Sequence, residues 1–581
     1  TTLQAAVGNS AALNSVTTNA GGTLVMNGGS VTTTGAQSYG EAITLGADTT
    51  LAAGAGNITL GSTVNDATAG VHSLILNSTG VTTLQAAVGN SAALNSVTTN
   101  AGGTLVMNGA SVTTTGAQSY GEAITLGVNT ILEAGAGTIS FMGTIDGAQT
   151  LAVNSTGTTL FNQAVGATTP LSSLTTNTGG MVLIGTSTVR TTGAQTFNEV
   201  MSLLGNVSFT GSTITLNDAV VGSGDLNVVG AAVLNAGTIS TSGAQTYNAN
   251  VTLMRDTVLT AGMSGLRFAS TVNGAYALTV NTSGDTAFDG NIGNTTPLSS
   301  LTTDAGTAGR LLMNGGSVST TGAQTYGEAI TLGVNTTLSS SAGGNIQLGN
   351  TVNGTKDLVV NTSGLTTFNG AVGLVTPLSS VSTDAGGTVF MNAGAVVTNG
   401  SQTYLDAMTL GAHTSLTSRD ASLNFLKIED GANPFNLNLQ THTGLTLGDV
   451  DIGGNLQVTT QASGVSQTTG THLNVGGLST FTADAGVNQV AALTSANNVF
   501  TGQLNLNQIN HGSWANVSVT TNAPLNLGPL QSSGSVSLQT HGALTTSTMA
   551  VTGNLNVSSN GGAVSLGETS VTGYMRDRKS T

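Results

Sequence analysis

The sequence contains no cysteine and very little charge. The absence of cysteine from 581 residues excludes disulfide bonds and thiolate metal sites. Charged residues make up 6% of the chain, against about 25% in an ordinary globular domain. The 10 basic residues are too few and too scattered to neutralise phosphates, and the net charge is −15. We therefore expect no nucleic-acid partner.

Long apolar runs and helix-forming residues are also scarce. No apolar run approaches the roughly 18 to 20 residues of a membrane-spanning helix, so no membrane-spanning segment is predicted. Disorder is not expected either, because 38% of the residues are hydrophobic. The chain is dominated by threonine and valine, which favour strands, and by glycine and asparagine, which favour turns. This composition predicts an all-β protein.

One phrase is repeated six times along the chain. "TTGAQSYGEAITLG" starts at Thr33 and again, unchanged, at Thr114, and looser copies start at Thr191, Thr241, Thr320 and Thr398. Its glutamines are separated by 81, 77, 50, 79 and 78 residues. Two further phrases, "TPLSSLTTNTGG" and "VNSTG", recur with it, but the 50-residue step lacks both. Such a deletion is easily accommodated in a stack of repeats and poorly in a closed globule.

Short alternating runs such as "GTLVMNGG" and "AITLG" lie within each repeat, and glycine or asparagine bounds them. This pattern is typical of strands, and its even spacing indicates coils of roughly 20 to 25 residues. We predict an elongated right-handed parallel β-helix, or β-solenoid, of roughly 23 to 29 coils, since parallel crossovers favour the right hand. Main-chain bonds between neighbouring coils would hold it together.

The repeat pattern suggests four segments. Residues 1–417 carry the repeats of about 80 residues, one of them shortened to about 50. Residues 418–435 form an irregular insertion or transition, and residues 436–575 follow a second repeat type. Residues 576–581 form a basic tail. The transition concentrates charge and is the predicted binding protrusion, with Arg419, Asp420, Lys427, Glu429 and Asp430.

The repeated glutamine and aromatic residues are predicted to be structural. Each glutamine is expected to cap its own turn by bonding exposed backbone. The ring two residues later is expected to fill a wide corner of the core, and stacking against a glycan is the alternative. These positions are Gln37, Gln118, Gln195, Gln245, Gln324 and Gln402, with Tyr39, Tyr120, Phe197, Tyr247, Tyr326 and Tyr404.

Candidate catalytic groups are few. Asp449 and Asp451 would share one strand face about 7 Å apart, which suits a general acid/base pair or a calcium site, although solvated side chains are the simpler interpretation. An acid follows the repeated glutamine by four residues in five copies, and we interpret it as a solubilising surface charge. These acids are Glu41, Glu122, Glu199, Glu328 and Asp406. No cofactor, metal site or catalytic activity is predicted.

The phrases "GAQTYGEAITLG", "TPLSSLTTDAG", "VNTSG" and "VTGNLNVSSNGG" give the chain a family resemblance. It resembles the repeats of large bacterial filamentous-haemagglutinin-like exoproteins over essentially its whole length. The resemblance implies a right-handed β-helix secreted by a Gram-negative bacterium through an outer-membrane partner, and it implies that the protein acts as an adhesin.

The function expected from these features is an extracellular structural and adhesive rod at a cell surface. Its partners would be host or neighbouring cells, including their glycans. One alternative is a self-assembling subunit of a filament or surface layer. A second alternative is a β-helix that binds or degrades polysaccharide.

Overall fold

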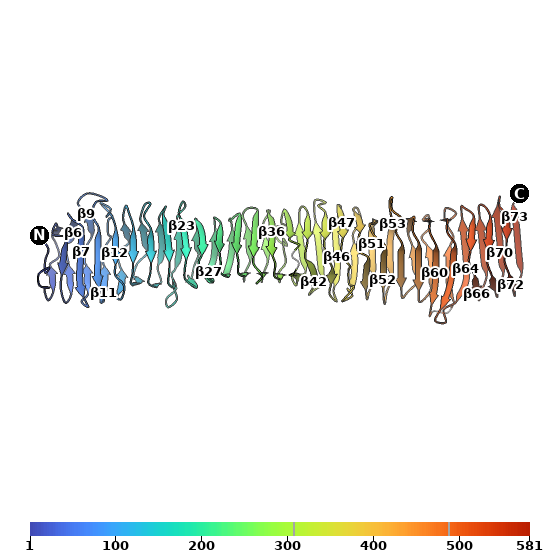
Figure 1. Cartoon of the computed structure of the whole chain (residues 1–581), viewed down its shortest axis with the longest axis horizontal. Coiled ribbons are helices and arrows are strands. Elements are labelled where there is room, and N and C mark those ends of the chain that lie inside the picture. The colour runs from blue at the N-terminus through green and yellow to red at the C-terminus, as the bar shows by residue number, and fades with distance from the viewer. Residues whose placement is uncertain (306–307, 486–487, 581) are drawn as a thin grey trace. The chain divides into compact units, whose positions relative to one another are not determined.

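Parallel strands make up the whole architecture. The computed structural model describes residues 1–305, 308–485 and 488–580. These residues contain strands and no helix, and the strands stack as a β-solenoid of about 27 turns. The predicted all-β solenoid is therefore confirmed, and the number of turns lies within the predicted range. The chain divides into two units, Thr1–Thr286 and Ala287–Thr581, and within each unit the strands lie side by side as successive rungs (Figure 1).

Each turn of the solenoid contains short strands joined at glycine-rich corners. In the first repeat these strands are β5 (Gln37–Tyr39), β6 (Ala42–Leu45), β7 (Thr49–Gly54) and β8 (Ile58–Leu60). Strand β5 pairs in parallel with β8, one turn later. Side chains alternate between buried and outward positions along each strand, as the period of a β-strand requires. Leucine, valine and isoleucine therefore mostly face inward, whereas threonine and serine occupy both outward and buried positions.

The sequence repeat does not contain a whole number of turns. Gln37 pairs with Ile58, Ile58 with Thr82 and Thr82 with Leu105, so three turns from Gln37 end at residue 105. Gln118 lies thirteen residues beyond that point. Strands β5, β15 (Gln118–Tyr120) and β25 (Gln195–Phe197) consequently belong to three different sheets. The first three copies of the phrase therefore occupy three different faces of the first unit.

The 50-residue step lacks one turn. Gln195 pairs with Ile214 and Ile214 with Ala232, so two turns from Gln195 end at residue 232. Gln245 again lies thirteen residues further. The long strands β27 (Val207–Leu216) and β29 (Leu226–Leu234) pair with each other here, and β29 pairs with β31 (Gln245–Tyr247). Pairing therefore continues through the shortened copy because its length differs by a full turn.

The two segments with unusual composition are part of the strand pattern. Within the predicted transition 418–435, β53 (Leu423–Glu429) pairs with β51 (Gln402–Leu410) and with β56 (Asp449–Ile452). Within the predicted basic tail, β73 (Met575–Ser580) pairs with β70 (Leu555–Asn560). Thr581 and the side chain of Lys579 lie outside the described part of the chain.

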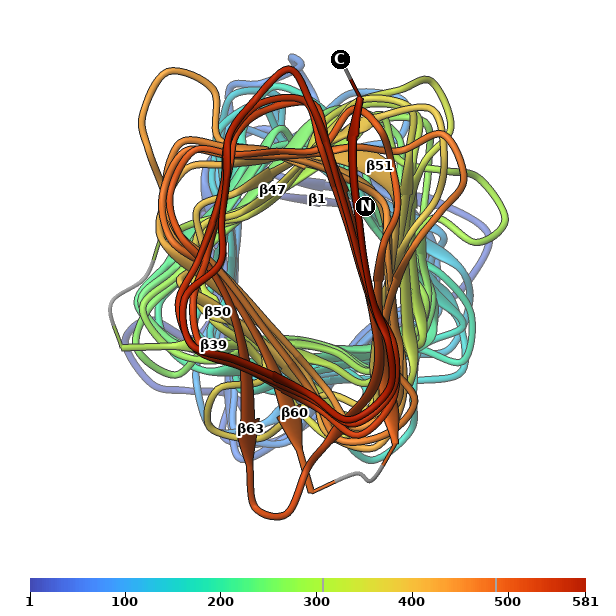
Figure 2. The ribbon, with the colours of Figure 1, turned by 90° about the vertical axis from the view of Figure 1, so that its right-hand side faces the viewer.

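One departure from the regular outline lies in the second unit. Strands β60 (Ser479–Asp484) and β63 (Leu504–Ile509) are longer than their neighbours and pair along their whole length. Seen end-on, they extend beyond the outline that the other turns of this unit share (Figure 2). This extension creates a wall beside the outer surface of the turns that follow.

The turn-based register predicts which deletions the fold tolerates. Thr159 pairs with Val182, so deleting residues 159–181 removes one turn and brings equivalent positions together. We expect this variant to keep its strand content and its resistance to proteolysis, because every later strand keeps its inward face. Deleting residues 159–170 removes about half a turn and should expose buried side chains. Circular dichroism and limited proteolysis measure both outcomes, and equal behaviour of the two variants would contradict the register.

Candidate functional site

Each repeated glutamine lies inside a corner of the solenoid. The Gln37 side chain is fully buried, and its Nε2 lies 3.1 Å from the carbonyl of Val31 and 2.9 Å from that of Ala52. Val31 lies in β4 (Ser30–Thr32), which pairs with β7 of the next turn, where Ala52 lies. The amide thus donates to two neighbouring turns at a corner where the Ala52 carbonyl also accepts from the backbone N–H of Thr33 at 2.8 Å. The same contacts recur at the other five glutamines. The structure differs from the predicted cap in that the backbone concerned is buried and belongs to two turns.

The aromatic ring of each phrase completes this corner. The Tyr39 hydroxyl donates to Gln37 Oε1 at 2.9 Å, and the other four tyrosines make the same bond. All six rings are buried, so they are not available for stacking on a glycan. Tyr120 and Phe141 stack with ring centroids 5.6 Å apart, and Phe141 stacks on Phe161 at 5.1 Å. The rings fill the core as predicted from their spacing.

Phe197 provides a natural comparison for the tyrosine hydroxyl. It replaces the tyrosine of the phrase, so nothing donates to Gln195 Oε1, which is buried without a hydrogen-bond partner. The Gln195 amide nitrogen keeps its contacts to Val189 and Thr210. This copy therefore lacks one bond while the rest of the corner is intact.

The five repeated acids are buried, so their interpretation as a solubilising surface charge is wrong. Glu122, Glu199 and Glu328 are at most 1% exposed, Asp406 is 2% exposed and Glu41 is 5% exposed. Burial raises the pKa of Glu122 to about 7, although hydrogen bonds from Thr82 and Thr99 oppose the shift. Burial also raises the pKa of Glu199 to about 7. The four glutamates lie between two strands, where strand alternation does not apply. Asp406 lies within β51, at the place where its pairing with β53 shifts register between Tyr404 and Ala407.

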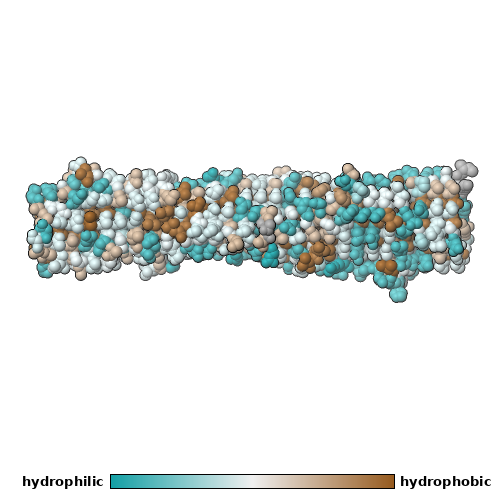
Figure 3. Space-filling view, in the orientation of Figure 1, coloured by the Kyte–Doolittle hydropathy of each residue, from teal (hydrophilic) through white to brown (hydrophobic). Residues whose placement is uncertain are grey.

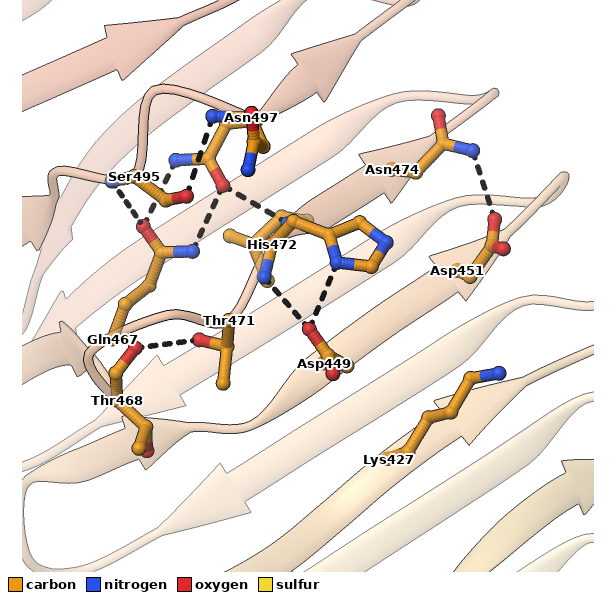
Figure 4. A network of polar contacts seen from close by, with 12 residues as sticks. Lys427, Asp449, Asp451, Gln467, Thr468, Thr471, His472, Asn474, Ser495 and Asn497 are labelled. Atoms are coloured by element: carbon orange, nitrogen blue, oxygen red, sulfur yellow. Dashed lines mark hydrogen bonds and ion pairs between the residues drawn. The ribbon is translucent and has the colours of Figure 1, made fainter.

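The surface acids Asp449 and Asp451 of the second unit form a ladder of cross-strand pairs (Figure 4). Asp449 Oδ1 accepts hydrogen bonds from the backbone N–H of His472 at 2.8 Å and lies 2.9 Å from its ring Nδ1. Asp451 Oδ1 accepts from Asn474 Nδ2 at 2.8 Å. Asn474 lies in β59 (Leu473–Val475), which pairs with β56, and His472 directly precedes this strand. Each carboxylate of the predicted acid pair therefore already has a partner on the following turn.

Lys427 and Glu429 extend this ladder on the preceding turn. They pair across the sheet with Asp449 and Asp451, and Lys427 Nζ lies 2.5 Å from Glu429 Oε2. The hydrogen bond to Glu429 raises the pKa of Lys427, and the charges of Asp451 and Asp449 act in the same direction. Both side chains of this ion pair are 36% exposed, so its contribution to stability is small.

The other residues of the predicted protrusion are dispersed. Arg419 and Asp420 are exposed in the corner after β52 (Thr414–Ser418), where their N–H groups bond the previous turn. Asp430 is buried, and its Oδ2 accepts from the backbone N–H groups of Phe435 and Gly453, each at 2.8 Å. Asp430 is thus a cap of its own corner, and only Lys427 and Glu429 share a surface.

Sequence reasoning missed His472 and Asn474. Both lie 23 residues after their acids, which is one turn of the solenoid. Applying the coil length as an offset would have paired them with Asp449 and Asp451. Within the described residues, no group of three or more histidine, aspartate or glutamate side chains could hold a metal ion. The described part of the chain also has no helix suited to crossing a membrane.

A polar groove lies beside the wall that β63 forms in the second unit. It has a volume of about 530 Å³, and Asn507 and Gln508 of β63 line one side. Its floor is the outer face of β66 (Leu530–Ser532), β69 (Met549–Val551) and β72 (Thr569–Val571), including Gln531, Ala550 and Ser570. Gln508 Nε2 donates to the Gln531 carbonyl at 2.6 Å, which joins the wall to the floor. Amides and hydroxyls share this surface with apolar residues, which are Leu506, Pro529, Leu530, Met549 and Ala550.

These features define a class of protein, the parallel β-solenoid built from internal repeats. A family model described as repeats of unknown function (DUF5649) matches residues 435–507 and 515–573. The matched residues lie in the second unit and include the groove floor and Asn507 of its wall, whereas Gln508 lies between the two matched ranges. No curated protein and no solved structure matches the chain.

The buried tyrosine hydroxyl predicts opposite effects of two matched substitutions. Phe197→Tyr should slow local opening around Gln195 by supplying the missing donor, with a gain of about 1 kcal/mol. Tyr120→Phe should leave Gln118 Oε1 unsatisfied and destabilise its corner by about 1 to 2 kcal/mol. Hydrogen exchange of peptides that cover each corner measures the change. Equal protection in both variants and the parent would show that the hydroxyl contributes nothing.

Proposed function

We propose that the chain is part of the shaft of an extracellular adhesive rod, a repeat segment of a large bacterial surface exoprotein. The observation that carries this proposal is the continuous backbone pairing of repeats that differ by whole turns. A stack of this kind can gain or lose a turn without changing its register, so repeat number sets length. The resemblance to filamentous-haemagglutinin-like exoproteins supports an adhesive role and secretion through an outer-membrane partner of a Gram-negative bacterium.

The proposed rod is not an enzyme. The predicted acid pair, Asp449 and Asp451, is engaged by His472 and Asn474 on the next turn. A general acid/base pair needs side chains free to exchange protons with a substrate. The ladder that includes Lys427 is better suited to holding neighbouring turns in register. A polysaccharide-degrading β-helix is therefore the less favoured alternative.

Contact with the surface of another cell is proposed to occur through the polar groove beside β63. Neutral amides and hydroxyls suit the hydroxyl groups of a glycan, and Glu568 is the one charged side chain of its lining. Gln531, Ala550 and Ser570 lie on successive turns, about 4.8 Å apart, so contacts repeat along the axis. A linear neutral glycan fits this arrangement better than a charged polymer does.

Exposed apolar residues of the surface are dispersed. The face in Figure 3 is mostly polar or neutral, with separate apolar patches. In the second unit Val375 is 84% exposed and Leu374 is 60% exposed, at the tip of one corner loop. A small patch of this kind suits weak contacts, and many weak contacts along repeated turns add up to firm attachment.

The groove predicts which substitution abolishes attachment. Ala550→Trp should fill the groove and weaken binding of the purified chain to glycan arrays and to cells by at least about tenfold. Thr545→Trp is the matched control, because Thr545 is exposed on another face of the same turn, in β68 (Leu544–Thr546). Equal binding by both variants would exclude the groove as the contact surface.

Further measurements on the same sample separate the other functions. Concentration-dependent sedimentation into ordered fibres, without binding to glycans or cells, would favour a self-assembling subunit. Cleavage of a polysaccharide that is lost in the Asp449→Asn and Asp451→Asn variants would favour the enzyme. Binding to neither glycans nor cells would overturn the adhesive role.

A further inference from the structure

In the folded chain, the buried acid of a repeat lies next to residues of two other repeated phrases. Glu122 directly precedes β16 (Ala123–Leu126). Strand β16 pairs with β13 (Thr104–Met107), which follows Gly103, and β13 pairs with β11 (Val81–Leu84), which follows Gly80. Gly103 ends the phrase "TTNAGG" and Gly80 ends "NSTG". Three successive turns therefore contribute an acid and two glycines to each such place, which we term a carboxyl corner.

The glycines provide the space that the acid occupies. A Cβ atom on Gly103 would lie 2.8 Å from Glu122 Oε1 and 2.5 Å from the carbonyl oxygen of Gly80. A Cβ on Gly180 would lie 2.9 Å from Glu199 Oε2, and one on Gly22 would lie 2.7 Å from Glu41 Oε1. Such distances are too short for any side chain. The acid thus reaches across the previous turn only because that turn has glycine there.

The one copy of the phrase without an acid also lacks these glycine phrases. Ala249 stands four residues after Gln245, in the shortened copy that has neither "TTNTGG" nor "VNSTG". The copies at Glu122, Glu199 and Asp406 have the acid together with both glycine phrases, and the copy at Ala249 lacks all three. This co-occurrence indicates that the acid and the glycines form one structural unit. The unit is separate from the glutamine and the tyrosine, because the shortened copy retains those two residues.

The carboxyl corner is rich in hydrogen-bond acceptors and poor in donors. The groups that face Glu122 are the hydroxyls of Thr82 and Thr99 and the glycine backbone at residue 103, and none carries a charge. Thr82 Oγ1 lies 3.5 Å from Glu122 Oε1. Most buried side-chain oxygens without a hydrogen-bond partner, among the described residues, belong to these corners. They are oxygens of Thr18, Glu41, Glu122, Thr159, Glu199, Thr303, Thr366, Thr383 and Asp406.

An ionised carboxylate in such a place would be buried beside carbonyl oxygens with too few donors. A neutral carboxyl group removes the charge and supplies one O–H donor. The Asp406 corner is a variation, because the Gly387 N–H donates to Asp406 Oδ1 at 2.8 Å and Asp384 faces it as a second acid. The aspartate side chain is shorter than that of glutamate, and the backbone N–H of Gly387 supplies a donor to it.

We propose that the carboxyl corners at Glu122 and Glu199 are a pH-sensitive lock of the stack, closed when the buried acid is protonated and loosened when it ionises. Burial raises the pKa of both groups from 4.5 to about 7 in the folded chain. A raised pKa means that the stabilisation is complete below pH 4.5 and is lost as the pH rises through 7. The corners therefore tighten in mildly acidic surroundings and open more readily in alkaline ones.

Hydrogen exchange on the full chain tests the lock. Protection of a peptide covering residues 97–126, corrected for intrinsic exchange, should fall several-fold between about pH 5 and about pH 8.5. Glu122→Gln should remove most of this dependence, because the amide is neutral at every pH. Glu133→Gln is the matched control in the same repeat, since the Glu133 side chain is exposed, and it should behave like the parent. A peptide around Ala249 should show no dependence in any variant.

Two results would overturn the proposal. One is a pH dependence that survives unchanged in Glu122→Gln. The other is a specific effect of calcium, sodium or potassium on the same peptide at constant ionic strength, lost in Glu122→Gln, which would assign the corner to a bound cation. If Glu122→Gln fails to fold, infrared spectra of the parent decide the matter. A protonated carboxyl band that titrates near pH 7 supports the lock, and its absence at mildly acidic pH refutes it.

Discussion

Backbone pairing between successive turns is the constraint on which the rest of the structure depends. Each strand bonds its neighbours on the turns before and after it, so the axial spacing is that of parallel strands, about 4.8 Å. This spacing aligns equivalent residues of consecutive turns directly above one another. Each side chain then contacts the equivalent side chains of the turns before and after it. A residue type that packs well in one turn therefore also packs well in the next. Tyr120, Phe141 and Phe161 stack in the core for this reason.

The corners hold the repeated glutamines and acids of the chain. The carbonyls of Ala52, Glu133 and Thr210 already accept a backbone N–H from the previous turn, and side chains add further bonds from inside. The repeated glutamine does so by bonding two turns at once. The acid of the same phrase reaches past glycines into a place that offers few donors. One phrase thus contains both a hydrogen-bonded amide and a buried acid, only four residues apart.

The class of fold was predictable because it depends on periodicity, which the sequence displays directly. Alternation within strands and the spacing of glycines gave the solenoid and its coil length. The burial of Glu122 and its equivalents was not predictable in this way, since alternation applies to strands and not to corners. The pairs Asp449–His472 and Asp451–Asn474 were within reach, because their separation equals one turn. The groove beside β63 was not, because it depends on the lengths of two strands in three dimensions.

The thirteen residues that each copy adds beyond complete turns have a geometric consequence. Within the first unit, the phrases at β5, β15 and β25 lie on different sheets, so anything that accompanies the phrase is distributed helically about the axis. A flat partner pressed against one side would meet a given feature once in three copies, whichever side it approached. Such a surface presents the same features on every side of the axis, so it has no preferred orientation toward its surroundings.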